Sequence, residues 1–184
     1  TDHHHIPDEL PKAHAIIHPR LERETYPGKW LAGAGVAFKL CQAMLIRHKA
    51  SEKELTTGDT HDGFEKWLLD MVAIATVADM VPLLGESRTL TKYGLIVLKK
   101  TRRIGLVKMY KEAGIMHEDG SWKREIDAGT IGYQIAPRIN AAGRIAHSNV
   151  AYELMTTKDP IKATDMAYQL EVNNNDRKKL VETM

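Results

Sequence analysis

Residues 67–84 form the most apolar window of the chain, and this window limits the folds that the chain can adopt. Asp70, Asp79 and Pro82 interrupt it. A charged side chain in the middle of a membrane span is costly, so we interpret the window as protein core. Residues 67–75 are apolar on nearly every helical face, which predicts a deeply buried helix that ends before Pro82.

Helical spacing of apolar residues dominates the rest of the chain. It predicts helices over residues 31–48, 62–75, 90–98 and 104–113, and a last helix that starts with Asp159 as cap and Pro160 in its first turn. The short apolar run at residues 13–17, bounded by two prolines, is the best strand candidate. The apolar stripe of the last helix ends near Val172, which is typical of a helix that leaves its domain.

The segment between these helices is predicted to be less regular. Residues 114–124 are expected to form a loop or hairpin, and Asp127 is expected to cap a helix that Pro137 interrupts. The segment APRINAAGR, residues 136–144, then looks like a specialised turn.

Composition excludes several classes of protein. The chain has 184 residues, of which 43% are hydrophobic, and this suits one domain or most of one rather than a disordered chain. A formal charge of +2 gives no bulk signature of nucleic-acid binding. The single cysteine, Cys41, excludes a disulfide framework and favours a buried thiol and a cytoplasmic location. The first residue is Thr1 and the end is a polar helix, so we expect a piece of a longer protein.

The first residues, TDHHH, bring one carboxylate and three imidazoles together. These groups are ligands for divalent transition metals, although a purification tag or a frayed terminus explains the three histidines equally well. Asp79 lies between apolar residues, so we expect a buried carboxylate that needs a metal, another partner or the backbone N–H groups of a turn. Asp2, His3, His4 and Asp79 are too few ligands for two octahedral metals, and this predicts half of a site.

A second candidate site is the polar part of APRINAAGR. Arg138, Asn140 and Arg144 stand among small residues that would let a phosphate approach the backbone. Solvated or ion-paired arginines explain the same pattern. We find no Ser, His and Asp arrangement, Walker motif or paired cysteine motif, so covalent catalysis has no support in the sequence.

Four segments taken in order, TDHH, LAGAGVAFKL, VAIATVADMVPLLGESR and QIAPRINAAGR, closely resemble the RecJ single-strand-specific exonucleases of the DHH phosphoesterase superfamily. The resemblance covers essentially the whole chain. It implies an α/β DHH phosphoesterase domain, of which this chain supplies a mostly α-helical part. One or two strands would come from the edge of a parallel sheet, and a long C-terminal connecting helix would follow. His5 and His147 stand where the family has other residues.

The resemblance also implies roles and boundaries. Residues 1–158 would be the C-terminal part of the catalytic domain, and residues 159–184 would start the helix that links it to a DHHA1 domain. Asp2, His3, His4 and Asp79 match metal-site residues for two Mn²⁺ or Mg²⁺ ions, and Arg138, Asn140 and Arg144 match a segment beside the cleft. Assigning Arg138 to substrate phosphate is our own hypothesis.

The implied activity is hydrolysis of single-stranded DNA from its 5′ end, in DNA repair and recombination. Single-stranded DNA, a repair helicase and a single-strand-binding protein are the expected partners, with no membrane. We expect the 184-residue piece alone to be inactive. The alternatives are a nanoRNase or cyclic dinucleotide phosphodiesterase of the same superfamily and a DNA-binding scaffold without catalysis.

Overall fold

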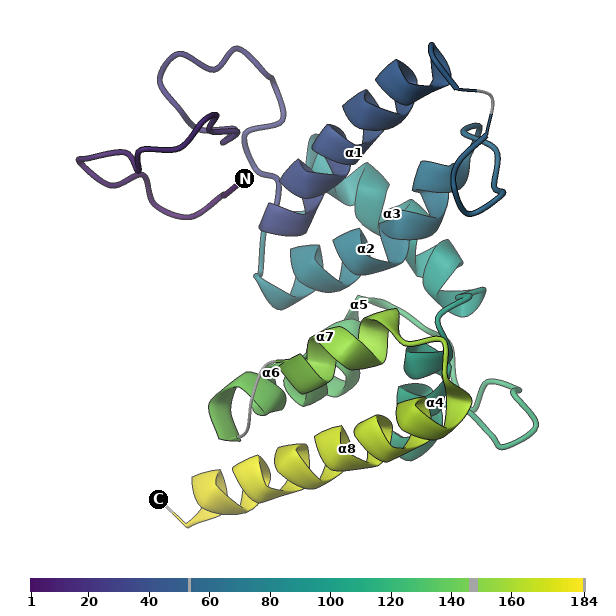
Figure 1. The fold of residues 1–184 in the computed structure, drawn as a ribbon. Coiled ribbons are helices and arrows are strands. Elements are labelled where there is room, and N and C mark those ends of the chain that lie inside the picture. Colours follow the sequence, from purple (N-terminus) through teal and green to yellow (C-terminus); the bar gives the residue numbers. More distant parts are fainter. Residues whose placement is uncertain (53, 146–148, 184) are drawn as a thin grey trace. The chain divides into compact units, whose positions relative to one another are not determined.

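The computed structural model describes residues 1–52, 54–145 and 149–183, and the chain divides into two compact units, residues 1–98 and 99–184. Both units are built from helices packed on helices (Figure 1). Within the described residues, the only β pairing is a single bridge between Met116 and Trp122. The mostly helical character expected from the sequence is therefore confirmed.

The first unit packs three helices and a short 3₁₀ turn around an apolar centre. The elements are α1 (Gly33–Lys49), η1 (Phe64–Leu68), α2 (Leu69–Ala78) and α3 (Gly85–Lys99). Phe38, Leu69 and Val72 are buried together at their centre. Gly94 of α3 lies so close to α2 that an added Cβ would approach the Leu69 carbonyl oxygen to 2.4 Å. The prediction of a deeply buried helix that ends before Pro82 is thus confirmed in α2.

Residues 1–32 contain no regular element, so the strand predicted at residues 13–17 does not form. One backbone hydrogen bond, from Asp2 N–H to the Ile17 carbonyl at 3.2 Å, holds this segment against the chain start. A strand needs a ladder of such bonds to a neighbouring extended segment, and the described part of the chain provides no such neighbour. The parallel sheet implied by the resemblance therefore stays a prediction.

The second unit is built around the long helix α8 (Pro160–Glu182), which lies along three other helices (Figure 1). These are α4 (Ile104–Glu112), α6 (Ala136–Ile145) and α7 (Asn149–Thr156). The predicted cap is confirmed, because the Asp159 carboxylate accepts hydrogen bonds from the N–H groups of Ile161 and Lys162.

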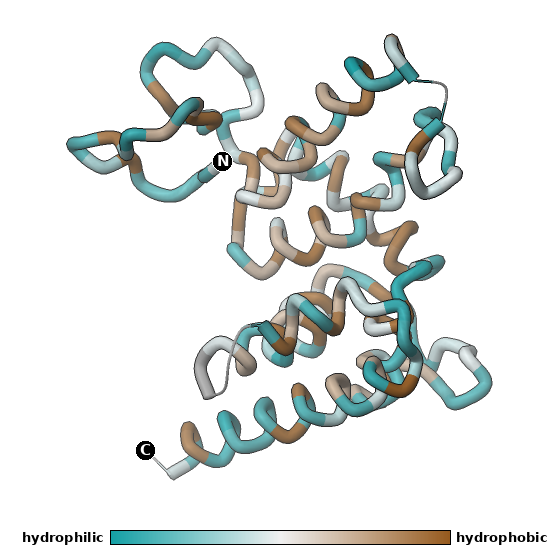
Figure 2. The backbone as a smooth tube through the Cα atoms, viewed as in Figure 1, coloured by the Kyte–Doolittle hydropathy of each residue, from teal (hydrophilic) through white to brown (hydrophobic). Residues whose placement is uncertain are grey.

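The apolar stripe of α8 is short, as Figure 2 shows by the mainly hydrophilic colours of its last turns. Burial nevertheless continues past Val172 to Asn173 and Asn174, two residues further than the sequence pattern indicates. From Lys178 to Thr183 the helix is exposed. The polar end therefore begins later than predicted.

The prediction of a turn at residues 136–144 is wrong. Asp127 caps α5 (Ala128–Thr130) through a reciprocal pair of bonds with Thr130, and the chain then continues through the π-helical turn η2 (Ile131–Ile135) into α6. Pro137 has no N–H to donate, and a π turn widens the helix just before it. The wide turn lets the helix continue through a residue that normally ends one.

No helix in the part of the chain that the structure describes is both long and apolar enough to span a bilayer. Cys41 is a free thiol on α1, and it is partly exposed rather than buried as we predicted.

Candidate metal centre

The segment that carries the first two histidines is held in place by two residues further along the chain. His18 is buried and bonds through Nε2 to the His4 carbonyl at 3.0 Å. The Arg20 guanidinium donates to the same carbonyl at 2.8 Å and also to the His3 carbonyl. These contacts fix the backbone of the two histidines, and the sequence patterns gave no sign of them.

Asp2 organises the segment from its start. Its Oδ1 atom accepts bonds from the His3 N–H at 2.7 Å, the His4 N–H at 3.2 Å and the His4 Nδ1 atom at 2.7 Å. The side-chain bond from His4, together with the two backbone bonds, holds the pKa of Asp2 far below its ordinary value of 3.8. Because the ionised carboxylate can only accept a hydrogen bond, Nδ1 of His4 carries the hydrogen and the lone pair lies on Nε2, which is the arrangement found in metal-ligating histidines.

Asp79 is placed by the way in which α2 ends. Val81 N–H bonds to the Thr76 carbonyl and Met80 N–H to the Val77 carbonyl, both at 3.1 Å, and Met80 has a φ of 54°. This is a Schellman motif with methionine in the left-handed position that glycine usually takes. Asp79 is the C-cap residue of α2, directly before Met80, so the motif fixes its backbone.

The expected burial of Asp79 is wrong, because 44% of its side chain is exposed. The flanking residues are apolar in sequence, but Met80 itself is 88% exposed, so the apolar flanks do not enclose the carboxylate. His3 nevertheless lies close to it, with its Nε2 atom 3.4 Å from Oδ2 of Asp79.

The spacing of His3 and Asp79 fits two ligands of one metal ion. At 3.4 Å the nitrogen and oxygen are further apart than in a usual N–H···O bond. Two donors that each lie about 2.1 Å from a common ion, at an angle of roughly 90–110°, are about 3.0–3.4 Å apart. Within the described residues no three His, Cys, Asp or Glu side chains gather closely enough to hold an ion. The described residues thus bring two candidate ligands together, and the expectation of half a site stays a prediction.

The two other histidines at the chain start are differently placed. The His4 ring lies 4.4 Å from the His3 ring between centroids and is largely exposed. His5 is exposed as well. Gly33 begins α1 beside His3, and an added Cβ would lie 3.2 Å from the Cδ2 atom of that ring. The small residue therefore lets the first turn of α1 approach a candidate ligand.

The residues of the second candidate site belong to the other unit and do not all share one helix face. Arg138 is buried in α6, where its Nε donates to Glu171 of α8 and its Nη1 donates to the Gln134 carbonyl at 2.7 Å. Asn140, two residues later, is exposed. The backbone of Arg144 belongs to α6, one turn after Asn140, but its side chain is outside the described part of the structure. His147 lies outside the described residues altogether. The pairing of Arg138 favours a structural role for it.

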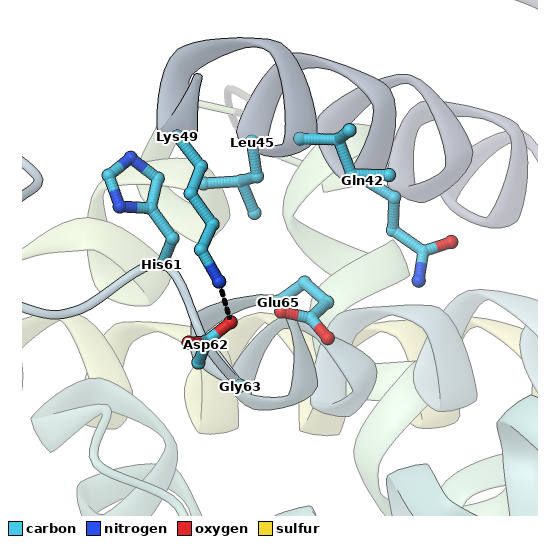
Figure 3. A pocket seen from close by; sticks show the side chains of 8 residues that line it. Gln42, Leu45, Lys49, His61, Asp62, Gly63 and Glu65 are labelled. Carbon is cyan, nitrogen blue, oxygen red and sulfur yellow. Dashed lines mark hydrogen bonds and ion pairs between the residues drawn. The ribbon is translucent and has the colours of Figure 1, made fainter. Parts of the chain in front are cut away.

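A separate pocket of about 160 Å³ lies between α1 and η1 (Figure 3). Lys49 and Asp62 form an ion pair of 2.6 Å at its edge, and the buried His61 shares a hydrogen bond of 2.8 Å with His48. These polar groups are thus paired with one another. No sequence pattern marks this pocket, because its residues come from a helix and from the polar loop that follows it.

Comparisons with known proteins agree on one family of relatives. The chain is 40% identical over 184 residues to the single-stranded-DNA-specific exonuclease RecJ of Bacillus subtilis, and it spans 21% of that protein. It is 34% identical over 188 residues to RecJ of Escherichia coli, of which it spans 31%. In both cases the match covers 100% of this chain. No family model matches the chain.

Solved structures give the same result. A crystal structure of exonuclease RecJ bound to manganese matches 98% of this chain and 41% of its own, with a TM-score of 0.76 and 30% identity. RecJ from Thermus thermophilus in complex with Mn²⁺ matches all of this chain and 24% of its own, with a TM-score of 0.76 and 28% identity. The chain thus spans about a fifth to a third of the curated relatives named above.

Proposed function

We propose that this chain, which is homologous over its whole length to a segment of the RecJ exonucleases, is the part of a catalytic domain that completes a two-metal site for cleaving single-stranded DNA. The observation that carries the proposal is the distance of 3.4 Å between His3 Nε2 and Asp79 Oδ2. This spacing suits a shared ion, and the homologous structures named above are bound to manganese.

We assign different tasks to the four residues at this centre. His3 and Asp79 would hold one ion together. His4 would ligate through Nε2, because Nδ1 is already bonded to Asp2. Asp2 would orient His4 and keep it in the ligating tautomer. The remaining ligands of two Mn²⁺ or Mg²⁺ ions would come from parts of the protein outside this chain.

Divalent ions, when bound, would act as Lewis acids that stabilise negative charge on the phosphate, and they would lower the pKa of a bound water to about 7. The residues of this chain hold the candidate metal ligands in place. Arg20 and His18 fix the carbonyls of His3 and His4, so the two rings need little rearrangement when ligands arrive. The Schellman motif at Met80 fixes Asp79 in the same way.

The proposed substrate is single-stranded DNA cleaved from its 5′ end, which would place the enzyme in DNA repair and recombination in the cytoplasm. A repair helicase that supplies single strands and a single-strand-binding protein are the partners that such a reaction needs. We further propose that residues 1–158 belong to the catalytic domain and that residues 159–184 begin its connection to a following domain. Asn140 and Arg144 are proposed to contribute to substrate binding, as the resemblance implies.

The hypothesis that Arg138 binds the substrate phosphate stays a prediction, because its bonds to Glu171 and Gln134 support a role in holding α6 against α8 instead. A nanoRNase activity on very short oligonucleotides is the second candidate function, because the same metal residues would serve it. A DNA-binding scaffold is the third.

The test is release of nucleotides from 5′-labelled single-stranded DNA by the full-length protein that carries this chain, with Mn²⁺. Asp79→Asn keeps the size of the side chain and removes a charged ligand, so we expect activity to fall by at least about 100-fold. Asp62→Asn is the matched control, since Asp62 is exposed and pairs with Lys49 in a different pocket.

Single-strand-selective release that is lost in Asp79→Asn and kept in Asp62→Asn supports the exonuclease. Release only from oligonucleotides of a few residues supports the nanoRNase instead. DNA binding without any release supports the scaffold and contradicts the proposal.

A further inference from the structure

Trp30 is an exposed aromatic side chain in a rigid setting close to the candidate metal centre. Its exposed fraction is 54%, which is high for a tryptophan. Single exposed apolar residues are common on proteins and need no function by themselves. The neighbours of Trp30 are what make its exposure informative.

The backbone that carries Trp30 is fixed from α3. The buried Ser87 hydroxyl donates to the Trp30 carbonyl. A few residues earlier, the Tyr26 hydroxyl donates to Glu86 at 2.6 Å, and Lys39 of α1 pairs with the same carboxylate at 3.0 Å. Residues 26–30 are therefore tied to two helices, and the indole is presented from a preorganised loop.

Arg20 connects the indole to the candidate ligands. Its guanidinium carbon lies 5.9 Å from the centre of the Trp30 ring, at the distance of a cation–π contact. The same guanidinium donates to the carbonyls of His3 and His4. The exposed Arg20 cation therefore lies between the exposed Trp30 ring and the two histidines. This order matches a nucleotide whose base contacts the ring and whose phosphate lies near the cation.

We propose that Trp30 is a stacking platform for a base of single-stranded DNA and that the Arg20 charge attracts the adjoining phosphate. This inference rests on the proposed function, since it deepens how that substrate is held. Every base has a π face, so stacking on an aromatic ring gives affinity with little sequence preference, and proteins that bind single strands commonly use it. Base-paired DNA keeps its bases stacked on one another, so the platform also favours single strands.

The test measures binding of an oligo-dT strand to the full-length protein that carries this chain in EDTA, where no metal and no cleavage contribute. Stacking on an aromatic side chain is worth about 1–3 kcal/mol per base, so Trp30→Ala should weaken binding by about 5- to 150-fold. Trp30→Phe, which keeps an aromatic ring, should retain most of the affinity. Tyr93→Ala is the matched control, because Tyr93 is also 54% exposed in the same unit.

A second ligand separates stacking from charge. A strand of the same length without bases should bind the wild type and Trp30→Ala equally, because it offers phosphates only. An equal loss of affinity for oligo-dT and for the strand without bases in Trp30→Ala would mean that Trp30 acts only through Arg20. This result would overturn the proposal. No effect of Trp30→Ala, an equal effect of Tyr93→Ala, or no binding of oligo-dT by the wild type would overturn it as well.

The outcome is independent of catalysis. Stacking without metal-dependent cleavage would leave the Trp30 proposal standing while the exonuclease proposal fails. Cleavage by the full-length protein with an unchanged KM in Trp30→Ala would support the exonuclease proposal and contradict the Trp30 proposal. Thermal unfolding of each variant shows whether the fold is retained.

Discussion

The backbone at Met80 determines where the Asp79 carboxylate lies. A left-handed methionine is strained by about 1 kcal/mol or more, and the two bonds of the Schellman motif hold it there. The sequence shows apolar residues on both sides of Asp79, and both its burial and its need for a partner were inferred from them. It cannot show that the helix ends in this motif, and for that reason burial was predicted where the side chain is half-exposed.

Arg138 is the residue for which the sequence and the structure favour different roles. In the sequence it stands among small residues, as an anion-binding arginine would. In the structure its side chain is buried between α6 and α8 and paired with Glu171, which is itself only 19% exposed. The partner lies 33 residues away along the chain, so no local pattern could reveal it.

Arg138→Met is therefore expected to lower the free energy of unfolding by about 3 kcal/mol, since it leaves the mostly enclosed Glu171 carboxylate without its partner. The double variant Arg138→Met with Glu171→Leu should recover most of that loss, because an apolar pair can replace a buried ion pair. Urea denaturation of the three proteins measures both effects. A single variant as stable as the wild type but deficient in DNA binding would instead support the phosphate role.

At the scale of elements, spacing and caps predicted most helices well. α1, α3, α4 and α8 all begin or end within a few residues of the predicted bounds, since apolar periodicity and capping residues act locally. The failure is at Pro137, where α6 continues because η2 widens the helix before the proline. A π turn has no simple sequence signature, so local rules predicted a break.

The capping box at Asp127 gives a prediction for the start of this helical run. Asp127→Ala should lower the free energy of unfolding by about 1 kcal/mol at neutral pH, because the carboxylate accepts the Thr130 N–H at 2.7 Å. Asp8→Ala is the control, since Asp8 is exposed in the irregular N-terminal segment. Thermal unfolding of both variants tests the cap.

The same cap should depend on pH. Bonds from the backbone and side chain of Thr130 lower the pKa of Asp127 below its ordinary value of 3.8. A lowered folded-state pKa means that the stabilisation is present above 3.8 and is lost as the pH falls through the lower folded value. The stability difference between wild type and Asp127→Ala should therefore shrink below pH 3.8. A constant difference down to the acid transition would contradict this assignment.

At the scale of the whole molecule, local patterns predicted the helical class, but they did not divide the chain into its two units. The break lies at residues 98–99, near the end of a continuous helix, where no loop or change in composition marks it. The strand that was predicted at residues 13–17 shows that local patterns also cannot decide whether a strand forms. A strand is stabilised by partners that can lie anywhere in a protein, so its own residues do not decide whether it forms.

The central claim is that His3 and Asp79 share a divalent metal ion. Titration of the full-length protein that carries this chain with Mn²⁺, followed by electron paramagnetic resonance, tests it most directly because free and bound Mn²⁺ give different signals. We predict saturable binding that weakens at least about tenfold in His3→Ala and in Asp79→Asn, while Asp62→Asn matches the wild type. Equal Mn²⁺ affinity in all four proteins, or no saturable binding by the wild type, would contradict the claim.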